Sequence, residues 1–162
     1  MLYLSQLMRL TPAKIRRNAT KVRITKIRAY MDADEKGPHK YCTCNAKALD
    51  GIRTVTMRLY GKMDEDGTMS PNNPVWVHCS CPYFKYYLEV ALAARGSASI
   101  LSSNGRYPKI RNPGMKPFLC KHAFLAGPIL AAAKAKRRKI TQIDDMDLEQ
   151  LVKLLEPFIP KK

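Results

Sequence analysis

Two pairs of residues whose side chains commonly bind metal ions are the clearest chemical feature of the sequence: Cys79 with Cys81, and Cys120 with His122. In an extended strand, residues two apart project from the same face, so the thiols of Cys79 and Cys81 can point at a single ion. On a regular helix, Cys120 and His122 would lie about 200° apart, so both can bind only where a loop passes into a helix. Three thiolates and one imidazole form a tetrahedral set that suits Zn²⁺ and leaves no coordination position for water. The spacing therefore predicts one structural zinc ion per chain.

A second cysteine pair, Cys42 and Cys44, follows His39 and also places its side chains on one face of an expected strand. These thiols could join Cys79 and Cys81 in a Cys₄ site, or flank the first ion from a neighbouring strand. Packing within the sheet is the interpretation that we favour. The chain has five cysteines, and their close spacing is typical of metal ligation in a reducing compartment, not of a disulfide framework.

The sequence contains little that would support catalysis. A catalytic zinc needs an open coordination position and a nearby general acid or base, whereas the expected ligand set is closed. Glu89 is the only carboxylate near the motif, and we expect it to be solvated on a helix. His78 alternates away from Cys79, which favours a packed or solvated ring. No Ser/His/Asp set, phosphate-binding glycine loop or deaminase motif is present, so we expect no enzyme.

The charge is strongly positive and unevenly distributed. The 29 Lys and Arg residues exceed the 13 Asp and Glu residues, which leaves a net charge of +16, and residues 1–31 and 90–143 contain no acid at all. Such segregation predicts a positive surface that attracts nucleic acid phosphates or an acidic protein, with a merely solubilising surface as the alternative. The candidate contact residues are Arg106, Lys109, Arg111, Lys116, Lys134, Lys136, Arg137, Arg138 and Lys139.

A small sheet and two helices must position the ligands. A strand is predicted at 21–30, and its alternation slips near Lys26, which indicates an edge position or a bulge. Residues 41–44 and 52–61 predict a hairpin about the Asp-Gly turn at 50–51, and 75–79 a further strand. A helix is predicted at 82–95, then a long basic loop at 97–117, then a helix reaching 138 that is kinked or restarted at Gly127 and Pro128.

The two ends of the chain are expected to differ from the centre. Residues 1–30 form a basic arm that we expect to be peripheral, and residues 141–162 an amphipathic helix with its leucines on one side. Residues 31–140 then form the zinc domain. The predicted fold class is α+β: a small antiparallel sheet, a zinc-stapled strand–helix core, a long basic loop and C-terminal helices.

The order of these motifs, a CxC pair at a strand end and a later CxH pair at a helix start, resembles a SWIM-type zinc finger. More narrowly, the segments VHCSCPYFKYYLEVALAARGS, SNG, NPG and PFLCKH resemble uncharacterised SWIM-type proteins of large tailed bacteriophages. The resemblance covers roughly residues 41–126. The sequence departs from the family pattern in one respect, because 38 residues separate Cys81 from Cys120, a longer spacing than in most SWIM domains. The resemblance implies DNA or protein partners.

Two functions are therefore expected. The first is a structural or assembly component of a phage virion, in which the arms dock on neighbouring viral structural proteins. The alternative is a nucleic-acid-binding module whose basic loop and helix track phosphates while tyrosines offer stacking. We expect neither a small-molecule substrate nor a membrane, because no apolar run approaches the roughly 20 residues of a span and the first residues do not form a signal peptide. The expected location is the host cytoplasm during assembly, then the virion.

Overall fold

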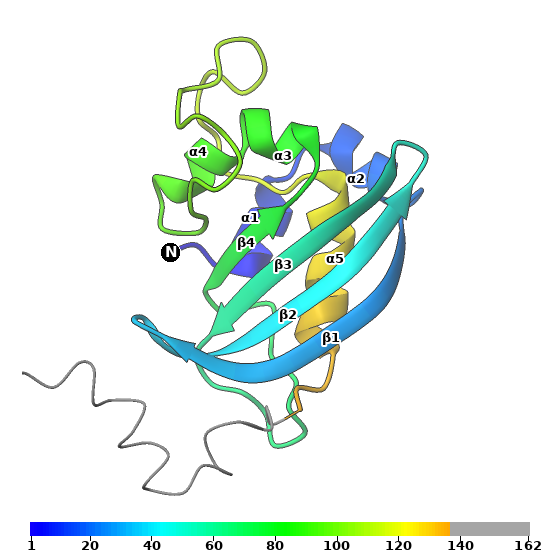
Figure 1. Cartoon of the computed structure of the whole chain (residues 1–162), viewed down its shortest axis with the longest axis vertical. Helices are drawn as coiled ribbons and strands as arrows, with labels where there is room; N and C mark the ends of the chain where they lie inside the picture. The colour runs from blue at the N-terminus through cyan, green and yellow to red at the C-terminus, as the bar shows by residue number, and fades with distance from the viewer. Residues whose placement is uncertain (137–162) are drawn as a thin grey trace, which may run out of the picture.

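The computed structural model describes residues 1–136, so the predicted helix at 141–162, with Arg137, Arg138 and Lys139, lies outside the described residues. Four antiparallel strands form one sheet in the order β1-β2-β3-β4. They are β1 (Arg23–Asp34), β2 (Gly37–Ala48), β3 (Gly51–Tyr60) and β4 (Val75–Cys79). The helices are α1 (Leu4–Leu10), α2 (Ala13–Ala19), α3 (Pro82–Tyr87), α4 (Glu89–Ala93) and α5 (Lys121–Ala132). Figure 1 shows α5 lying across one face of the sheet, so the predicted α+β class with a small antiparallel sheet is confirmed.

The edge strand β1 contains the predicted irregularity. Its pairing with β2 shifts register between Thr25 and Arg28, and Lys26 has a φ of 52°, which L-residues rarely adopt. A bulge of this kind lets one extra residue loop out while the rest of the ladder continues. Both the edge position and the bulge inferred from the slipped alternation are therefore confirmed, although β1 and β2 extend further than predicted.

The N-terminal segment belongs to the core, so its predicted peripheral position is wrong. Leu4 and Leu7 are fully buried, and the amide of Leu4 donates to the carbonyl of Asn73. α5 passes close to this segment at Gly127, where an added Cβ would lie 3.0 Å from Leu4 Cδ1. The basic residues that suggested a free arm lie after Leu7, mostly on exposed positions of α2 and its flanks. Apolar spacing in α1 thus outweighs the charge of the segment.

Both predicted long helices are shorter than expected. The helix expected at 82–95 breaks at Leu88, whose φ of −121° separates α3 from α4. α5 continues through Pro128 but ends at Ala132 instead of 138. The chain then turns toward β1, where Lys136 forms a parallel bridge with Tyr30. The candidate contact residues Lys134 and Lys136 therefore follow the helix and do not extend it.

Lys40 explains why α5 stops there. This lysine is fully buried, and its Nζ donates to the carbonyls of Ala131, at 2.7 Å, and Ala133. The last carbonyls of a helix lack intrahelical partners and carry partial negative charge, which a buried ammonium group can satisfy. β2 thus fixes the C-terminal end of α5 against the sheet.

The basic loop is anchored by Glu89, which is fully buried and not solvated as predicted. Its carboxylate accepts hydrogen bonds from the backbone amides of Leu101, Ser102 and Ser103, at 2.6 to 3.3 Å. Burial raises the pKa of Glu89, but these hydrogen bonds outweigh it and hold the pKa below the ordinary value of 4.5. The loop at 97–117 contains no helix or strand, as predicted, and Glu89 fixes where it begins.

Glu89→Gln is expected to release the start of the loop while leaving the sheet intact. Because the folded pKa lies below the unfolded one, the carboxylate's stabilising effect is complete above pH 4.5 and is lost as the pH falls through the folded pKa. In the wild type, the protection of the amides of 101–103 against hydrogen exchange, relative to the intrinsic rate at each pH, should therefore fall toward low pH; in the variant this protection should already be low at neutral pH. Equal protection in both proteins at neutral pH would contradict this role.

Among the helices of residues 1–136, none has the length and apolar character that crossing a membrane requires.

Candidate metal centre

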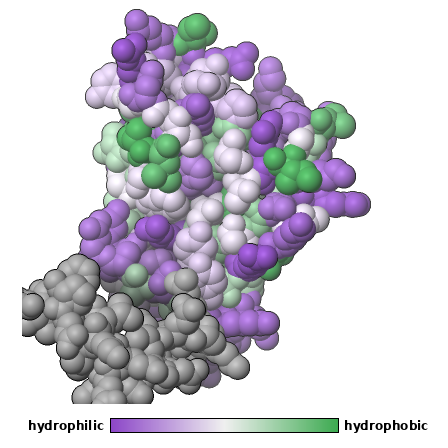
Figure 2. Space-filling model, in the orientation of Figure 1, coloured by the Kyte–Doolittle hydropathy of each residue, from purple (hydrophilic) through white to green (hydrophobic). Residues whose placement is uncertain are grey.

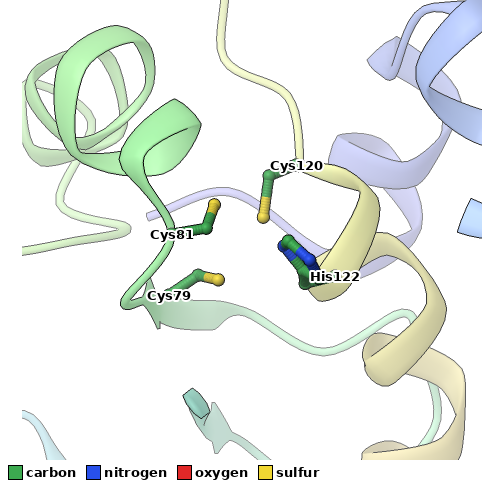
Figure 3. Close-up of side chains that lie close together, drawn as sticks. All are labelled: Cys79, Cys81, Cys120 and His122. Atoms are coloured by element: carbon green, nitrogen blue, oxygen red, sulfur yellow. The ribbon is translucent and has the colours of Figure 1, made fainter. Parts of the chain in front are cut away.

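Three elements, β4, α3 and α5, bring the four predicted ligands together at one end of the sheet. Cys79 is the last residue of β4, and Cys81 is the N-cap of α3. Cys120 is the N-cap of α5, and His122 lies in the first turn of that helix. Figure 3 shows the four side chains pointing toward a common point between the strand end and the two helix starts. The expected loop-to-helix junction at 120–122 is therefore present.

The spacing of these four side chains fits a metal ion. One ligand atom from each residue lies within 4.8 Å of the others, and all four residues are buried. A tetrahedron with metal–sulfur bonds of about 2.3 Å has sulfur–sulfur edges of about 3.8 Å, so a bound ion requires only a small contraction. The Cys₃His cluster could hold a metal ion, and we call these four residues the metal centre.

Two helix starts favour the thiolate form in the metal centre. The Cys81 sulfur accepts a hydrogen bond from the Phe84 amide at 3.3 Å, and the Cys120 sulfur accepts one from the Ala123 amide at 3.4 Å. Hydrogen bonds from Cys120 and Cys79 lower the pKa of Cys81, whereas burial raises the pKa of Cys120. One thiol thus ionises readily, and a cation would be needed to deprotonate its neighbours.

His122 has the unmet bonding capacity that a metal ligand should have. Its side chain is 1% exposed, yet neither ring nitrogen has a hydrogen-bond partner. Buried polar atoms without partners are rare because their desolvation is uncompensated. The Nε2 atom lies 3.8 Å from Oδ1 of Asp50, which leaves Nδ1 as the nitrogen for an ion.

Asp50 is the residue beside the metal centre that sequence reasoning missed. It lies between β2 and β3, and its Oδ1 also accepts a hydrogen bond from Lys121 Nζ at 2.8 Å. That hydrogen bond lowers the pKa of Asp50, so the carboxylate is ionised at neutral pH. A carboxylate beside the second nitrogen of a metal-binding histidine fixes the ring's orientation and tautomer. The Asp-Gly pair at 50–51 indicated only a turn, and nothing local pointed to His122.

Asp50→Asn is expected to weaken metal binding without removing a ligand. Loss of a carboxylate that orients a ligating histidine typically costs about 10- to 100-fold in metal affinity. Competition with a chromophoric chelator measures this loss directly. Lys121→Met serves as the matched control, because it removes the salt bridge but keeps the carboxylate beside His122. An affinity loss in Lys121→Met as large as in Asp50→Asn would assign the effect to the salt bridge instead.

Comparison with protein-family models, curated proteins and solved structures finds no match to this chain. The SWIM resemblance thus stays a prediction from the motif. The geometry of the metal centre is an independent observation, and it does not depend on that resemblance.

The second cysteine pair takes no part in the metal centre. Within residues 1–136, the four residues above form the only Cys, His and carboxylate group with metal-binding spacing. Cys42 and Cys44 are buried in β2, where burial raises the pKa of each thiol to about 11. The Cys42 thiol donates to the carbonyl of Leu130 at 3.5 Å. His39 contacts the Tyr60 ring and lies 3.7 Å from Asp34. These positions agree with sheet packing.

The basic candidates lie at separate places. Arg106, Lys109 and Lys116 are exposed on the loop. Arg111 lines a hollow of about 530 Å³ that opens beside the metal centre. Lys134 and Lys136 line a different hollow along β1. The described part of the chain therefore does not gather all its candidates into one stripe.

Proposed function

We propose that this chain is a non-enzymatic binding protein whose fold is held by one structural zinc ion. The observation that carries the proposal is the closed Cys₃His cluster, in which every ligand comes from the protein and all four are buried. Structural zinc sites have this composition, whereas catalytic sites keep three protein ligands and an open position. Hard cations such as Mg²⁺ and Ca²⁺ take oxygen ligands, so the thiolates select against them.

Cobalt substitution tests the closed site. With Co²⁺ in place of zinc, we expect the intense visible absorption of a four-coordinate thiolate site, at one equivalent per chain. Azide should leave the spectrum unchanged, because no coordination position is open to it. A spectrum that shifts on adding azide would indicate an exchangeable position and would favour a catalytic metal.

As partner we propose a nucleic acid. The loop at 97–117 contains no acid and carries its four basic residues between 106 and 116. Its exposed side chains that could stack or pack on bases include Tyr107, which is 72% exposed. The hollow beside the metal centre adds Lys14 to this basic surface, next to Arg111 of the loop. Phosphate contacts from Lys and Arg, with aromatic stacking, are typical of single-strand binding.

Assembly into a virion is the second candidate. Exposed hydrophobic residues at the tip of the β2–β3 hairpin support this candidate, because Leu49 is 99% exposed and Ile52 is 59% exposed. Figure 2 shows hydrophobic residues as separate spots among hydrophilic ones on this face of the molecule, which is less than a stable apolar interface needs. The burial of α1 also leaves the N-terminal segment unavailable as a free docking arm.

A further inference from the structure

A basic hollow lies against the metal centre and is built from parts of the chain that are distant in sequence. Its volume is about 530 Å³ and includes the space beside Cys81, Cys120 and His122 of the metal centre, which also line it. One wall is made by α2, one by the start of α3, one by the loop and one by the start of α5. Its polar lining outside the metal centre comprises Lys14, Asn18, Asp50, Tyr83, Arg111 and Lys121. We call this the basic hollow.

The charge balance of the basic hollow favours an anion. Lys121 is paired with Asp50 at 2.8 Å, so these two charges cancel locally. Lys14 and Arg111 have no salt bridge to any acid within residues 1–136. A zinc ion with three thiolates carries one negative charge, which the two unpaired cations exceed. The start of α5, which has partial positive charge, forms part of the wall.

The backbone next to Arg111 is fixed by hydrogen bonds of its neighbour, Asn112. The next residue, Asn112, has a φ of 67°, and its Nδ2 donates to the carbonyls of Tyr87, at 2.9 Å, and Lys116, at 3.0 Å. Its Oδ1 accepts from the Lys116 amide at 2.9 Å. The Arg111 guanidinium lies 5.7 Å from the centre of the Tyr87 ring. Binding therefore costs little ordering of the loop at this point.

We propose that the basic hollow binds a phosphate group of a nucleic acid backbone. Lys14, Arg111 and Tyr83 line different walls of the hollow and carry hydrogen-bond donors, which suits an oxyanion. An acidic protein side chain is the competing ligand. The phosphate is favoured because residues 90–143 contain no acid, so further cations continue along the loop toward successive phosphates. The inference rests on the proposed zinc, because the ion would join the two walls that carry the cysteines.

Inorganic phosphate tests the hollow itself. In the zinc-loaded full-length protein, phosphate titration should shift the NMR amide signals of residues around Tyr83, Arg111 and Lys121, and leave those of β1 in place. Lys14→Gln with Arg111→Gln should remove the shifts. The matched control, Lys47→Gln with Lys62→Gln, makes the same charge change at exposed positions outside the hollow and should keep them. Shifts that survive the Lys14 and Arg111 changes would overturn the proposal.

A short oligothymidylate then tests the source of the phosphate. On a single strand, removing one cation that neutralises a phosphate should reduce the slope of log affinity against log salt by about 0.7. Because Lys14 and Arg111 would contact the same phosphate, we expect a reduction of about 0.7 for the double variant, and little change for the Lys47 and Lys62 control. Equal slopes for both variants would overturn the assignment to this hollow.

The outcomes separate the hollow from the proposed nucleic acid function. Phosphate shifts without oligothymidylate binding would support the hollow as an oxyanion site and contradict the nucleic acid partner. Oligothymidylate binding with no effect of the double variant would support the partner and overturn the hollow. Polyglutamate that displaces phosphate at lower concentration than oligothymidylate would overturn the phosphate assignment in favour of an acidic protein.

Discussion

Cys120→Ser is expected to abolish stoichiometric zinc binding and to unfold the protein at ordinary temperatures. Cys120 lies at the start of α5, so its thiolate would join that helix through the ion to the end of β4. Structural zinc contributes about 10 to 16 kcal/mol of apparent binding free energy in small zinc domains, which is comparable to the whole stability of a typical domain. Elemental analysis should find one zinc per wild-type chain, and circular dichroism should show loss of cooperative melting in the variant.

Cys44→Ser is the matched control, because it makes the same atom change at an equally buried position outside the metal centre. Both cysteines are 1% exposed, but Cys44 packs in β2. The control should keep its zinc and lose only the small amount of stability that a buried polar replacement costs. Zinc retained by Cys120→Ser, or equal destabilisation by both changes, would contradict the proposed site. Two zinc ions per chain would instead make ligands of His39, Cys42 and Cys44.

The metal centre could be predicted from sequence because its geometry is local. A strand end brings Cys79 and Cys81 to one side, and a loop-to-helix junction does the same for Cys120 and His122. Each pair is fixed by its own few residues, and the fold has only to bring the two pairs together. The hairpin and the bulge in β1 could be predicted for the same reason, since alternation and turn residues act over short distances.

The remaining parts of the site depend on contacts between distant segments. Asp50 lies beside His122 although the two are far apart in the sequence, and no local pattern connects a hairpin turn to a helix start. Glu89 has the spacing of a solvated helical residue, yet the incoming loop buries it. The break at Leu88 and the packing of Leu4 under α5 likewise follow from tertiary packing, which overrides the local helical and charge patterns.

Nucleic acid affinity is expected to fall steeply with salt, and the basic loop should account for much of the slope. Lys and Arg that neutralise phosphates release counterions, so log affinity for a single strand falls against log salt by about 0.7 for each phosphate neutralised. Gln substitutions together at Arg106, Lys109, Arg111 and Lys116 should therefore reduce the slope by up to about 2.8. Fluorescence anisotropy with labelled DNA and RNA, at several salt concentrations, measures this. The control variant carries the same number of Gln substitutions at exposed cations outside the loop, which are Arg23, Lys36, Lys47 and Lys62.

The assembly alternative predicts the opposite pattern, because an interface with an apolar core depends little on salt. In that case nucleic acid binding would be weak and would vanish near physiological salt, and both sets of substitutions would reduce it equally. Leu49→Asp, at a position that is 99% exposed and so does not support the core, should then prevent incorporation into particles while the fold is kept. Tight nucleic acid binding at physiological salt that is lost only in the loop variant, with its circular dichroism unchanged, would instead establish the nucleic acid partner. The control variant has the same net charge as the loop variant, so its continued binding would show that the position of the loop cations matters.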